Sequence, residues 1–287
     1  MGTRYNDVWV TGSTGYLGRE IAHRLANRGY TVYGTDQDVD ITDFDQVKEF
    51  VRRNRPQVVV NCAGMRRTLV TPQNKNEAIK VNGLGPRNLA IATASIDSLL
   101  VQFSSDDVFS RIMDEPVDEF DAPVPDTTYG KSKLVGENFI RELNPRHIII
   151  RSSWLYHADG GDMGEMVVSA MEGRPLSRRV DQIACPTSVR TVCHFLMRAI
   201  QAHEYGLFHV VSSGACTRLE FAREVYRLLG TDPQLVTAAE SDKATAQNII
   251  LEPLMVQMTG VTELPTWQQD LEGYLKRVGL IPEGGAR

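Results

Sequence analysis

A glycine-rich turn near the N-terminus constrains the fold of this chain more than any other feature. It follows the apolar run 8–10 directly and has the spacing Gly12-x-x-Gly15-x-x-Gly18. Apolar residues then recur every fourth residue up to Leu25, as on one face of a helix, and Gly29 ends that helix. A strand, a glycine turn and a helix in this order let backbone amides approach the pyrophosphate of a dinucleotide. The segment therefore predicts a nucleotide-binding α/β unit.

Strands and helices alternate with short connections over the first half of the chain. Further strands are expected at 31–34, 58–60, 99–103 and 147–150, and helices at about 47–51 and 78–89. The run 58–60 is β-branched throughout, as in a parallel strand that is buried on both faces. This order predicts a doubly wound parallel sheet, a Rossmann-type α/β fold.

The alternation loosens after residue 155, where glycine and proline separate shorter elements and helices are expected at 189–200 and 219–229. We expect residues 1–155 to form the dinucleotide-binding domain, completed by parts of about 180–211 and 246–259. A smaller C-terminal subdomain is expected to bind the substrate. It comprises about 156–179, 212–245 and 260–287.

The composition is that of an ordinary globular protein. Of the 287 residues 42% are hydrophobic, and the net charge of −5 leaves no basic excess to displace the counterions of a nucleic acid. No apolar run approaches the ~18 residues that span a bilayer, and the first strand begins too early for a signal peptide. The four cysteines and the histidines show no metal-ligand spacing. We therefore expect a cytoplasmic protein with reduced thiols, no metal, and no nucleic-acid or membrane partner.

A tyrosine and a lysine four residues apart form the most reactive pair in the sequence. Tyr129 and Lys133 lie in a segment expected to be helical, where this spacing places both side chains on one face. A free phenol has a pKa near 10, and a neighbouring ammonium group favours the phenolate and brings the tyrosine toward working pH. The pair can protonate a carbonyl oxygen beside a nicotinamide, with Lys133 also holding the nicotinamide ribose. The spacing alone is common, but after a glycine turn in an α/β chain it indicates a reductase.

Other polar residues follow predicted strands, where open α/β sheets bind their ligands. Asp36 comes just after the second strand, where a carboxylate accepts hydrogen bonds from an adenosine ribose and repels the 2′-phosphate of NADP. It favours NAD(H), whereas Arg19 can favour NADP(H). Ser105 follows the strand 99–103 and can donate to a carbonyl oxygen as charge develops. Asn82 is either a structural residue or part of a proton path.

These segments resemble the extended short-chain dehydrogenase/reductases, and among them the dTDP-4-dehydrorhamnose reductase family. Similar stretches run nearly from end to end. They are Asp40-Ile-Thr-Asp43, Val81-Asn82, Phe103-Ser-Ser-Asp-Asp-Val-Phe109, Tyr129-Gly-Lys-Ser-Lys-Leu-Val-Gly-Glu137, Arg151-Ser-Ser-Trp154, Asp181-Gln-Ile-Ala-Cys-Pro-Thr187, Gly206-Leu-Phe-His209 and Pro265-Thr-Trp267. The resemblance implies that NAD(P)H reduces the C4 ketone of a nucleotide-linked deoxysugar, as in dTDP-rhamnose biosynthesis. It is compatible with a homodimer.

Motif and resemblance together give three sets of expected site residues. The catalytic set is Ser105, Tyr129 and Lys133, with Ser105 standing where the family usually has threonine. The cofactor-binding set is Gly12, Ser13, Thr14, Gly15, Tyr16, Leu17, Gly18, Asp36, Asp40, Ile41, Cys62, Ala63, Gly64, Asn82, Tyr129 and Lys133. The substrate set is Arg66, Ser105, Asp107 and Trp154.

The chain departs from the family on the substrate side. Met65-Arg66-Arg67-Thr68 replaces a Tyr-Thr pair and an acidic stretch, and Asp107 replaces a tyrosine. An Arg-Pro pair expected before 249–251 is absent, with Ala246-Gln-Asn248 nearby. An arginine after the strand 58–60 can favour a substrate that carries a carboxylate or phosphate. Alternatively it pairs with Asp107 and shrinks the pocket, or it points into solvent.

Two other functions remain open at this point. One is a nucleotide-sugar epimerase or dehydratase on the same fold, against which the reductase-like motifs weigh. The other is a non-catalytic regulatory subunit that keeps the cofactor site and binds a partner enzyme, since the methionine adenosyltransferase regulatory subunit resembles this family. The intact pair of Tyr129 and Lys133 weighs weakly against it.

Overall fold

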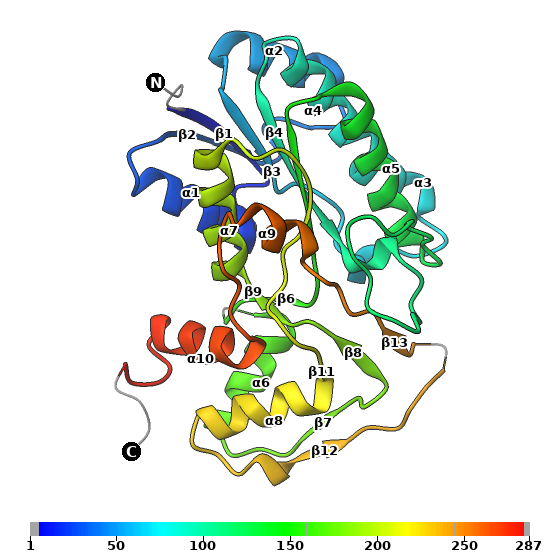
Figure 1. Cartoon of the computed structure of the whole chain (residues 1–287), viewed down its shortest axis with the longest axis vertical. Coiled ribbons are helices and arrows are strands. Elements are labelled where there is room, and N and C mark those ends of the chain that lie inside the picture. The colour runs from blue at the N-terminus through cyan, green and yellow to red at the C-terminus, as the bar shows by residue number, and fades with distance from the viewer. Residues whose placement is uncertain (1–5, 159, 244, 284–287) are drawn as a thin grey trace.

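A parallel sheet forms the centre of the computed structural model, which describes residues 6–158, 160–243 and 245–283 (Figure 1). The order of its strands is β10-β5-β4-β3-β1-β2. Their bounds are β1 Asp7–Thr11, β2 Thr31–Thr35, β3 Val58–Asn61, β4 Leu99–Ser105, β5 His147–Ser152 and β10 Gly206–His209. Because β2 and β3 lie on opposite sides of β1, the order reverses at β1, and ligands of such sheets bind at the carboxyl ends of the strands there. The predicted doubly wound α/β fold is confirmed.

Helices cover both faces of the sheet because its strands are apolar on both sides. One face carries α1 (Tyr16–Ala26), α7 (Val189–Ala202) and α9 (Leu254–Thr259), and the other carries α2 (Phe44–Asn54), α4 (Gly85–Ala94) and α5 (Thr128–Leu143) (Figure 1). In β1, Val8 and Val10 belong to the core between the sheet and α1, α7 and α9, called the first core below. Trp9 belongs to the core on the other face of the sheet, where its ring stacks on that of Phe50 with centroids 4.3 Å apart.

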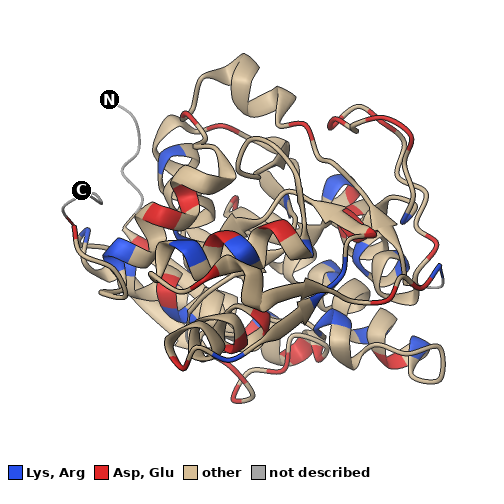
Figure 2. Ribbon diagram, turned by 90° about the horizontal axis from the view of Figure 1, so that it is seen from below, with Lys and Arg blue, Asp and Glu red and all other residues tan. Residues whose placement is uncertain are grey.

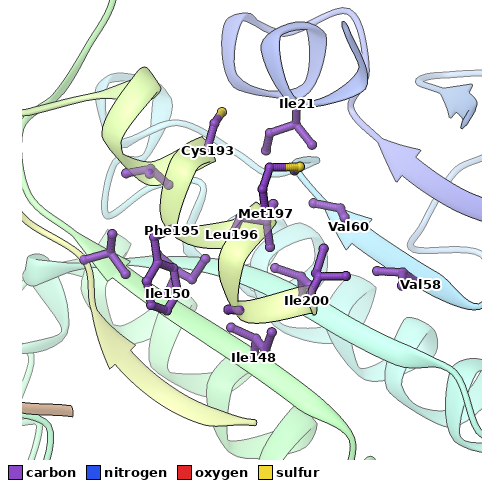
Figure 3. Packing of buried hydrophobic residues seen from close by; sticks show 14 of the residues in the cluster. Ile21, Val58, Val60, Ile148, Ile150, Cys193, Phe195, Leu196, Met197 and Ile200 are labelled. Carbon is purple, nitrogen blue, oxygen red and sulfur yellow. The ribbon is translucent and has the colours of Figure 1, made fainter. Parts of the chain in front are cut away.

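Helix α7 supplies a large share of the first core. Figure 3 shows Phe195 against Ile150 of β5 and Ile200 against Ile148, while Met197 lies beneath Ile21 of α1. All these side chains are at most 2% exposed. The helix therefore joins the N-terminal unit to the later strands through apolar contact.

The helical stretch expected at 78–89 is present within a longer helical run and contains a π-helical turn. Helix α3 (Lys75–Ile79) passes into a π-helical turn, η2 (Lys80–Leu84), before α4 begins. Pro86 in the first turn of α4 has no N–H to donate, so a regular i to i−4 ladder cannot run through this point. The predicted helical stretch is therefore confirmed, and the π-helical turn within it was not predicted. Asn82 lies in this turn, a feature often found at functional sites.

The later part of the chain adds a smaller layer of helices and short strands, below the sheet in Figure 1. Its helices are α6 (Gly161–Met171), α8 (Arg218–Leu228) and α10 (Trp267–Arg277). Its strands are β6 Leu155–Tyr156, β7 Leu176–Arg178, β8 Gln182–Ala184, β9 Thr187–Ser188, β11 Cys216–Thr217, β12 Val236–Ala238 and β13 Gln247–Asn248. Met166, Val225 and Leu271 lie at the centre of a separate apolar core. The chain crosses between the two layers several times, since α7, β10 and α9 return to the sheet.

A buried carboxylate ties α10 to the rest of the molecule. Asp270 accepts hydrogen bonds from the backbone N–H and Oγ of Ser188, from Oγ1 of Thr191 and from Oγ of Ser212, at 2.6–2.8 Å. Both oxygens are thereby satisfied, as a buried charge requires.

The charged residues do not gather into a basic stripe in the view of Figure 2, where Lys and Arg alternate with Asp and Glu. Over the described ranges, no helix combines the length and apolar character needed to cross a membrane.

Replacing Phe195 by alanine tests the role of α7. We expect the free energy of unfolding in urea to fall by about 3–5 kcal/mol, because the change leaves a cavity between helix and sheet. His194→Ala, at the neighbouring exposed position of the same helix, should change it by less than about 0.5 kcal/mol. If Phe195→Ala lowered the free energy of unfolding as little as His194→Ala, α7 would contribute little to the core.

Candidate active site

Glycine is required at two positions of the N-terminal turn. Gly12 has a positive φ of 61°, and a Cβ added there would lie 2.7 Å from the backbone N of Ala63. A Cβ added at Gly18 would lie 2.3 Å from the carbonyl oxygen of Gly12. The turn after β1 therefore packs tightly against both the loop after β3 and the first turn of α1. Gly15 precedes α1 and donates its N–H to the Gly12 carbonyl at 3.1 Å.

The turn and the start of α1 fit a dinucleotide pyrophosphate. The first N–H groups of a helix lack intrahelical acceptors and carry a partial positive charge. Helix α1 has no acidic residue in its first turn to compete for them. Ser13 donates its backbone N–H to Thr35 at 3.0 Å, which fixes the turn against the end of β2. A phosphate group can therefore approach a preformed cradle.

The predicted ribose-binding carboxylate lies beside this cradle. Asp36 follows β2 directly, and the Thr14 hydroxyl of the glycine turn donates a hydrogen bond to its carboxylate. Asp40 is used within its own loop, where it accepts from the N–H and hydroxyl of Thr42 at 2.8 and 3.0 Å. Ile41 is buried, and a Cβ at Gly85 would lie 2.6 Å from its side chain. Ile41 therefore packs against the start of α4 and holds this loop in place.

Asn82 anchors the loop that follows β3. Its Oδ1 accepts the backbone N–H of Met65 at 2.8 Å, and its Nδ2 donates to the Met65 carbonyl at 3.2 Å and to Oγ of Ser132 at 3.0 Å. A Cβ at Gly64 would lie 3.0 Å from the same Oδ1. Cys62 and Ala63 of this loop border Gly12. Asn82 thus connects the loop to α5 through the π-helical turn.

The structure brings the tyrosine and lysine of α5 to the end of β4. Thr127 caps α5 by accepting the Gly130 N–H at 2.9 Å, which starts the helix just before Tyr129. Lys133 lies one turn later and donates its Nζ to the Phe103 carbonyl at 2.6 Å. The predicted helix and the shared face of the pair are thereby found.

Burial shifts both of these groups toward their neutral forms. It lowers the pKa of Lys133 to about 8, although Glu137 acts in the opposite direction. It raises the pKa of the Tyr129 phenol, and the nearby carboxylates of Asp107 and Asp106 raise it further. The phenol therefore holds its proton firmly before a reaction begins.

Ser105 stands at the end of β4 in a network of side chains. Its Oγ donates to Oδ1 of Asp106 at 2.8 Å and accepts the N–H of Asp107 at 3.2 Å. Asp106 also accepts from Ser153 at 2.6 Å and from Gln247 at 3.4 Å. Residues from β4, from the position just after β5, and from β13 therefore meet at one carboxylate.

Of the two adjacent arginines, Arg67 rather than Arg66 meets Asp107. Nε of Arg67 lies 3.4 Å from Oδ2 of Asp107, and its Nη1 donates to Gln247 at 3.1 Å. Arg66 is exposed and immediately precedes the 3-10 turn η1 (Arg67–Leu69). The predicted pairing of Asp107 with one of the two arginines is thus present, whereas Arg66, the expected substrate contact, does not take part in it.

Trp154 faces an arginine that sequence reasoning missed. The guanidinium of Arg218, in α8, lies 3.6 Å from the centroid of the Trp154 ring. Its Nη1 donates to Asp162 at 3.0 Å, and Arg178 pairs with the same carboxylate at 2.9 Å. Trp154 itself has a positive φ of 37°, an uncommon conformation that the surrounding packing must hold. No sequence motif marks Arg218 or Gln247, because both belong to the smaller layer and come to the site only when this layer packs against the sheet.

A ring contact joins the residues after the glycine turn to the smaller layer. The Tyr16 ring stacks on His157 with centroids 4.1 Å apart and planes 15° apart. Burial raises the pKa of Tyr16, while Arg66 lowers it. The cradle after β1 and the segment after β6 thus touch.

The assembled groups are suited to proton transfer beside a nucleotide. Tyr129, Lys133 and Ser105 lie at the same edge of the sheet as the glycine turn. Over the described part of the chain, no group of three or more His, Cys, Asp or Glu side chains is arranged to hold a metal ion.

Comparisons with known proteins place most of the chain in one group. A protein-family model described as the RmlD substrate binding domain matches residues 6–280. A dTDP-4-dehydrorhamnose reductase of Mycolicibacterium smegmatis is 30% identical over 283 residues, covering 94% of this chain and 85% of that protein. A dTDP-4-keto-6-deoxy-D-glucose reductase of Streptomyces niveus is 34% identical over 241 residues, covering 83% and 84%.

Solved structures agree with this grouping. A dTDP-4-dehydrorhamnose reductase from Clostridium acetobutylicum has a TM-score of 0.87 at 34% identity and covers 94% of this chain and 99% of its own. The dTDP-4-dehydrorhamnose reductase of Bacillus anthracis, in complex with NADP, has a TM-score of 0.89 at 29% identity, with coverage of 96% and 100%.

Gly18→Ala tests the cradle. The added methyl group must displace the Gly12 carbonyl, and a strain of about 1–3 kcal/mol should weaken binding of NAD⁺ and NADP⁺ by roughly tenfold or more in isothermal titration. Gly273→Ala in α10 is the control, because there the nearest atom, at 3.0 Å, is the flexible end of Arg190. Unchanged affinity in Gly18→Ala would mean that the dinucleotide does not bind on this turn.

Proposed function

The chain belongs to the RmlD substrate binding domain family, and from this premise we propose that it is an NAD(P)H-dependent oxidoreductase that reduces the C4 ketone of a nucleotide-linked deoxysugar. The observation that carries the proposal is that the start of α5, with Tyr129 and Lys133, packs against the end of β4, where Ser105 lies, in a sheet whose glycine turn fits a pyrophosphate. By their names, the relatives from M. smegmatis and S. niveus reduce dTDP-linked sugars.

The glycine turn and the start of α1 would hold the pyrophosphate of the cofactor, and Lys133 its nicotinamide ribose. A bound reduced nicotinamide supplies the hydride. The loop after β3, with Cys62, Ala63 and Gly64, lies next to Gly12 and is held by Asn82, so it can border the same cofactor. The protein contributes orientation and electrostatics.

Tyr129 is the proposed general acid. Burial and the carboxylates of Asp106 and Asp107 keep its phenol protonated, so a proton is available when charge develops on the ketone oxygen. Lys133, with a pKa of about 8, is largely cationic at neutral pH and stabilises the phenolate that remains. Ser105 donates its one hydroxyl hydrogen to Asp106, and rotation of this hydroxyl would let it donate to the ketone oxygen instead.

We propose that the C-terminal subdomain expected at about 156–179, 212–245 and 260–287 supplies the substrate side, through residues of the smaller layer described above. Arg218 is positioned on the Trp154 ring, and Arg178 shares its partner Asp162. Guanidinium groups held in this way suit the diphosphate of a nucleotide sugar, because they donate several hydrogen bonds in a fixed plane. Arg67, in η1 after β3, adds a third guanidinium within electrostatic range of Arg218.

Tyr129→Phe tests the general acid. Loss of the hydroxyl should lower turnover of dTDP-4-dehydrorhamnose by at least ~10²-fold while leaving cofactor affinity nearly unchanged. Tyr30→Phe removes a hydroxyl from a tyrosine ahead of β2 and should keep full activity. The assay follows NAD(P)H absorbance, and equal turnover in Tyr129→Phe and the parent would contradict the role.

Asp36→Ala tests the preference for NADH that we propose from its position beside Thr14. A carboxylate favours ribose hydroxyls and repels a 2′-phosphate. The parent should bind NADH more tightly than NADPH in isothermal titration, and the variant should narrow the difference. Asp45→Ala, on the exposed side of α2, should leave it unchanged. Preference of the parent for NADPH would show that a cation such as Arg19 governs this site.

A further inference from the structure

Asp107 is a buried carboxyl group with incomplete hydrogen bonding. Its side chain is 2% exposed, and within the described structure its Oδ1 has no hydrogen-bond partner. Its Oδ2 has two long contacts, both 3.4 Å, from Oγ of Ser105 and Nε of Arg67. The adjacent Asp106, in contrast, accepts from Ser105, Ser153 and Gln247. A charge on Asp107 is therefore poorly compensated.

The turn that carries Asp107 packs directly on the start of α5. A Cβ at Gly130 would lie 1.8 Å from the Asp107 carbonyl oxygen, so only glycine allows this approach. The preceding residue is Tyr129. In the low-dielectric interior a charge at Asp107 acts strongly on a nearby phenol. Of the charged groups around Tyr129, Asp107 has the largest effect, and it raises the pKa of the phenol.

The groups that face Asp107 come from three other segments besides its own turn. Burial and Asp106 raise its pKa, and Asp126, from the loop before α5, adds a smaller increase. Arg67 of η1 and the Ser105 hydroxyl lower it. Asp126 is itself paired with Arg111 at 3.1 Å, and Arg218 of α8 faces Asp106. Together these effects raise the pKa of the Asp107 carboxyl group to about 7, so it changes charge near neutral pH.

We propose that Asp107 controls proton transfer from Tyr129: its carboxylate holds the proton on the phenol, and its neutral form lets the phenol release that proton to the ketone oxygen. Arg67 sets the pH of the change, because its guanidinium favours the carboxylate. One proton moves, from Oη of Tyr129 to the substrate oxygen, and Asp107 acts only through the field at the phenol. The inference rests on the reductase function proposed above.

The sign of the pH dependence follows from this arrangement. Below pH 7 Asp107 is neutral and Tyr129 is the stronger acid. Above pH 7 the carboxylate forms and makes Tyr129 a weaker acid. Reduction should therefore slow as the pH rises through about 7.

The first experiment compares pH profiles of kcat for dTDP-4-dehydrorhamnose reduction. In the parent we expect a fall of roughly threefold to tenfold between about pH 6 and pH 8. Asp107→Asn should lose the inflection near pH 7, whatever its absolute rate, and keep only the decline that loss of the Lys133 charge causes near pH 8. In Arg67→Gln the Asp107 inflection should remain, with its midpoint at a higher pH. Asp97→Asn, a surface carboxylate just ahead of β4, should reproduce the parent profile. Profiles of Asp107→Asn and the parent with the same inflection would overturn the proposal.

The second experiment does not depend on turnover. Tyrosines labelled with ¹³C at Cζ are titrated by NMR in the full-length protein, with Tyr129→Phe identifying the Tyr129 signal. The parent should show a small step in this signal near pH 7, and Asp107→Asn should lack the step and show a lower phenol pKa. Identical titration of Tyr129 in both proteins overturns the control by Asp107. If instead the step is present and no ketosugar is reduced, the reductase function fails while the coupling between the two residues stands.

Discussion

The close approach of α5 to the carboxyl end of β4 is the contact on which the candidate site depends. Gly130 allows the Asp107 carbonyl to lie against the first turn of α5. Lys133 then reaches the Phe103 carbonyl, and this hydrogen bond offsets part of the cost of burying an ammonium. A larger side chain at Gly130 would separate helix and turn, and the phenol, the ammonium and Ser105 would no longer share one edge of the sheet.

A buried ion pair reinforces the same contact one turn further along. Arg151 at the end of β5 donates to both oxygens of Glu137 in α5, at 3.1 and 2.7 Å, and both residues are fully buried. The guanidinium also lies 5.1 Å from the centroid of the Phe109 ring. Burial, with the charge of Arg151, lowers the pKa of the adjacent His209 to about 3, so this imidazole stays neutral. Such a pair is worth most for the geometry it imposes, since removing one partner leaves an uncompensated charge.

The two layers of the molecule divide the work of the proposed reaction. The sheet and its helices position the cofactor cradle and the proton donor. The smaller layer contributes Arg218 against Trp154, and it meets the glycine turn where His157 stacks on Tyr16. Asp270 fixes α10 to this layer with four hydrogen bonds. The electrostatic balance around Asp106 and Asp107 is therefore set by both layers together.

Sequence alone determined the class of fold, the glycine cradle and the pair of Tyr129 and Lys133. These are local patterns, in which spacing along a strand or helix decides which side chains share a face. It also offered the pairing of Asp107 with an adjacent arginine as one of three alternatives, because both follow neighbouring strands. Only the tertiary structure decided that Arg67 rather than Arg66 makes this contact, and that Arg218 and Gln247 complete the site. Those residues arrive from distant segments through the packing of the smaller layer, and no local period encodes which of their side chains turns inward. The charge of Asp107 near neutral pH belongs to the same category, since burial and the distances to its neighbours exist only in the folded chain.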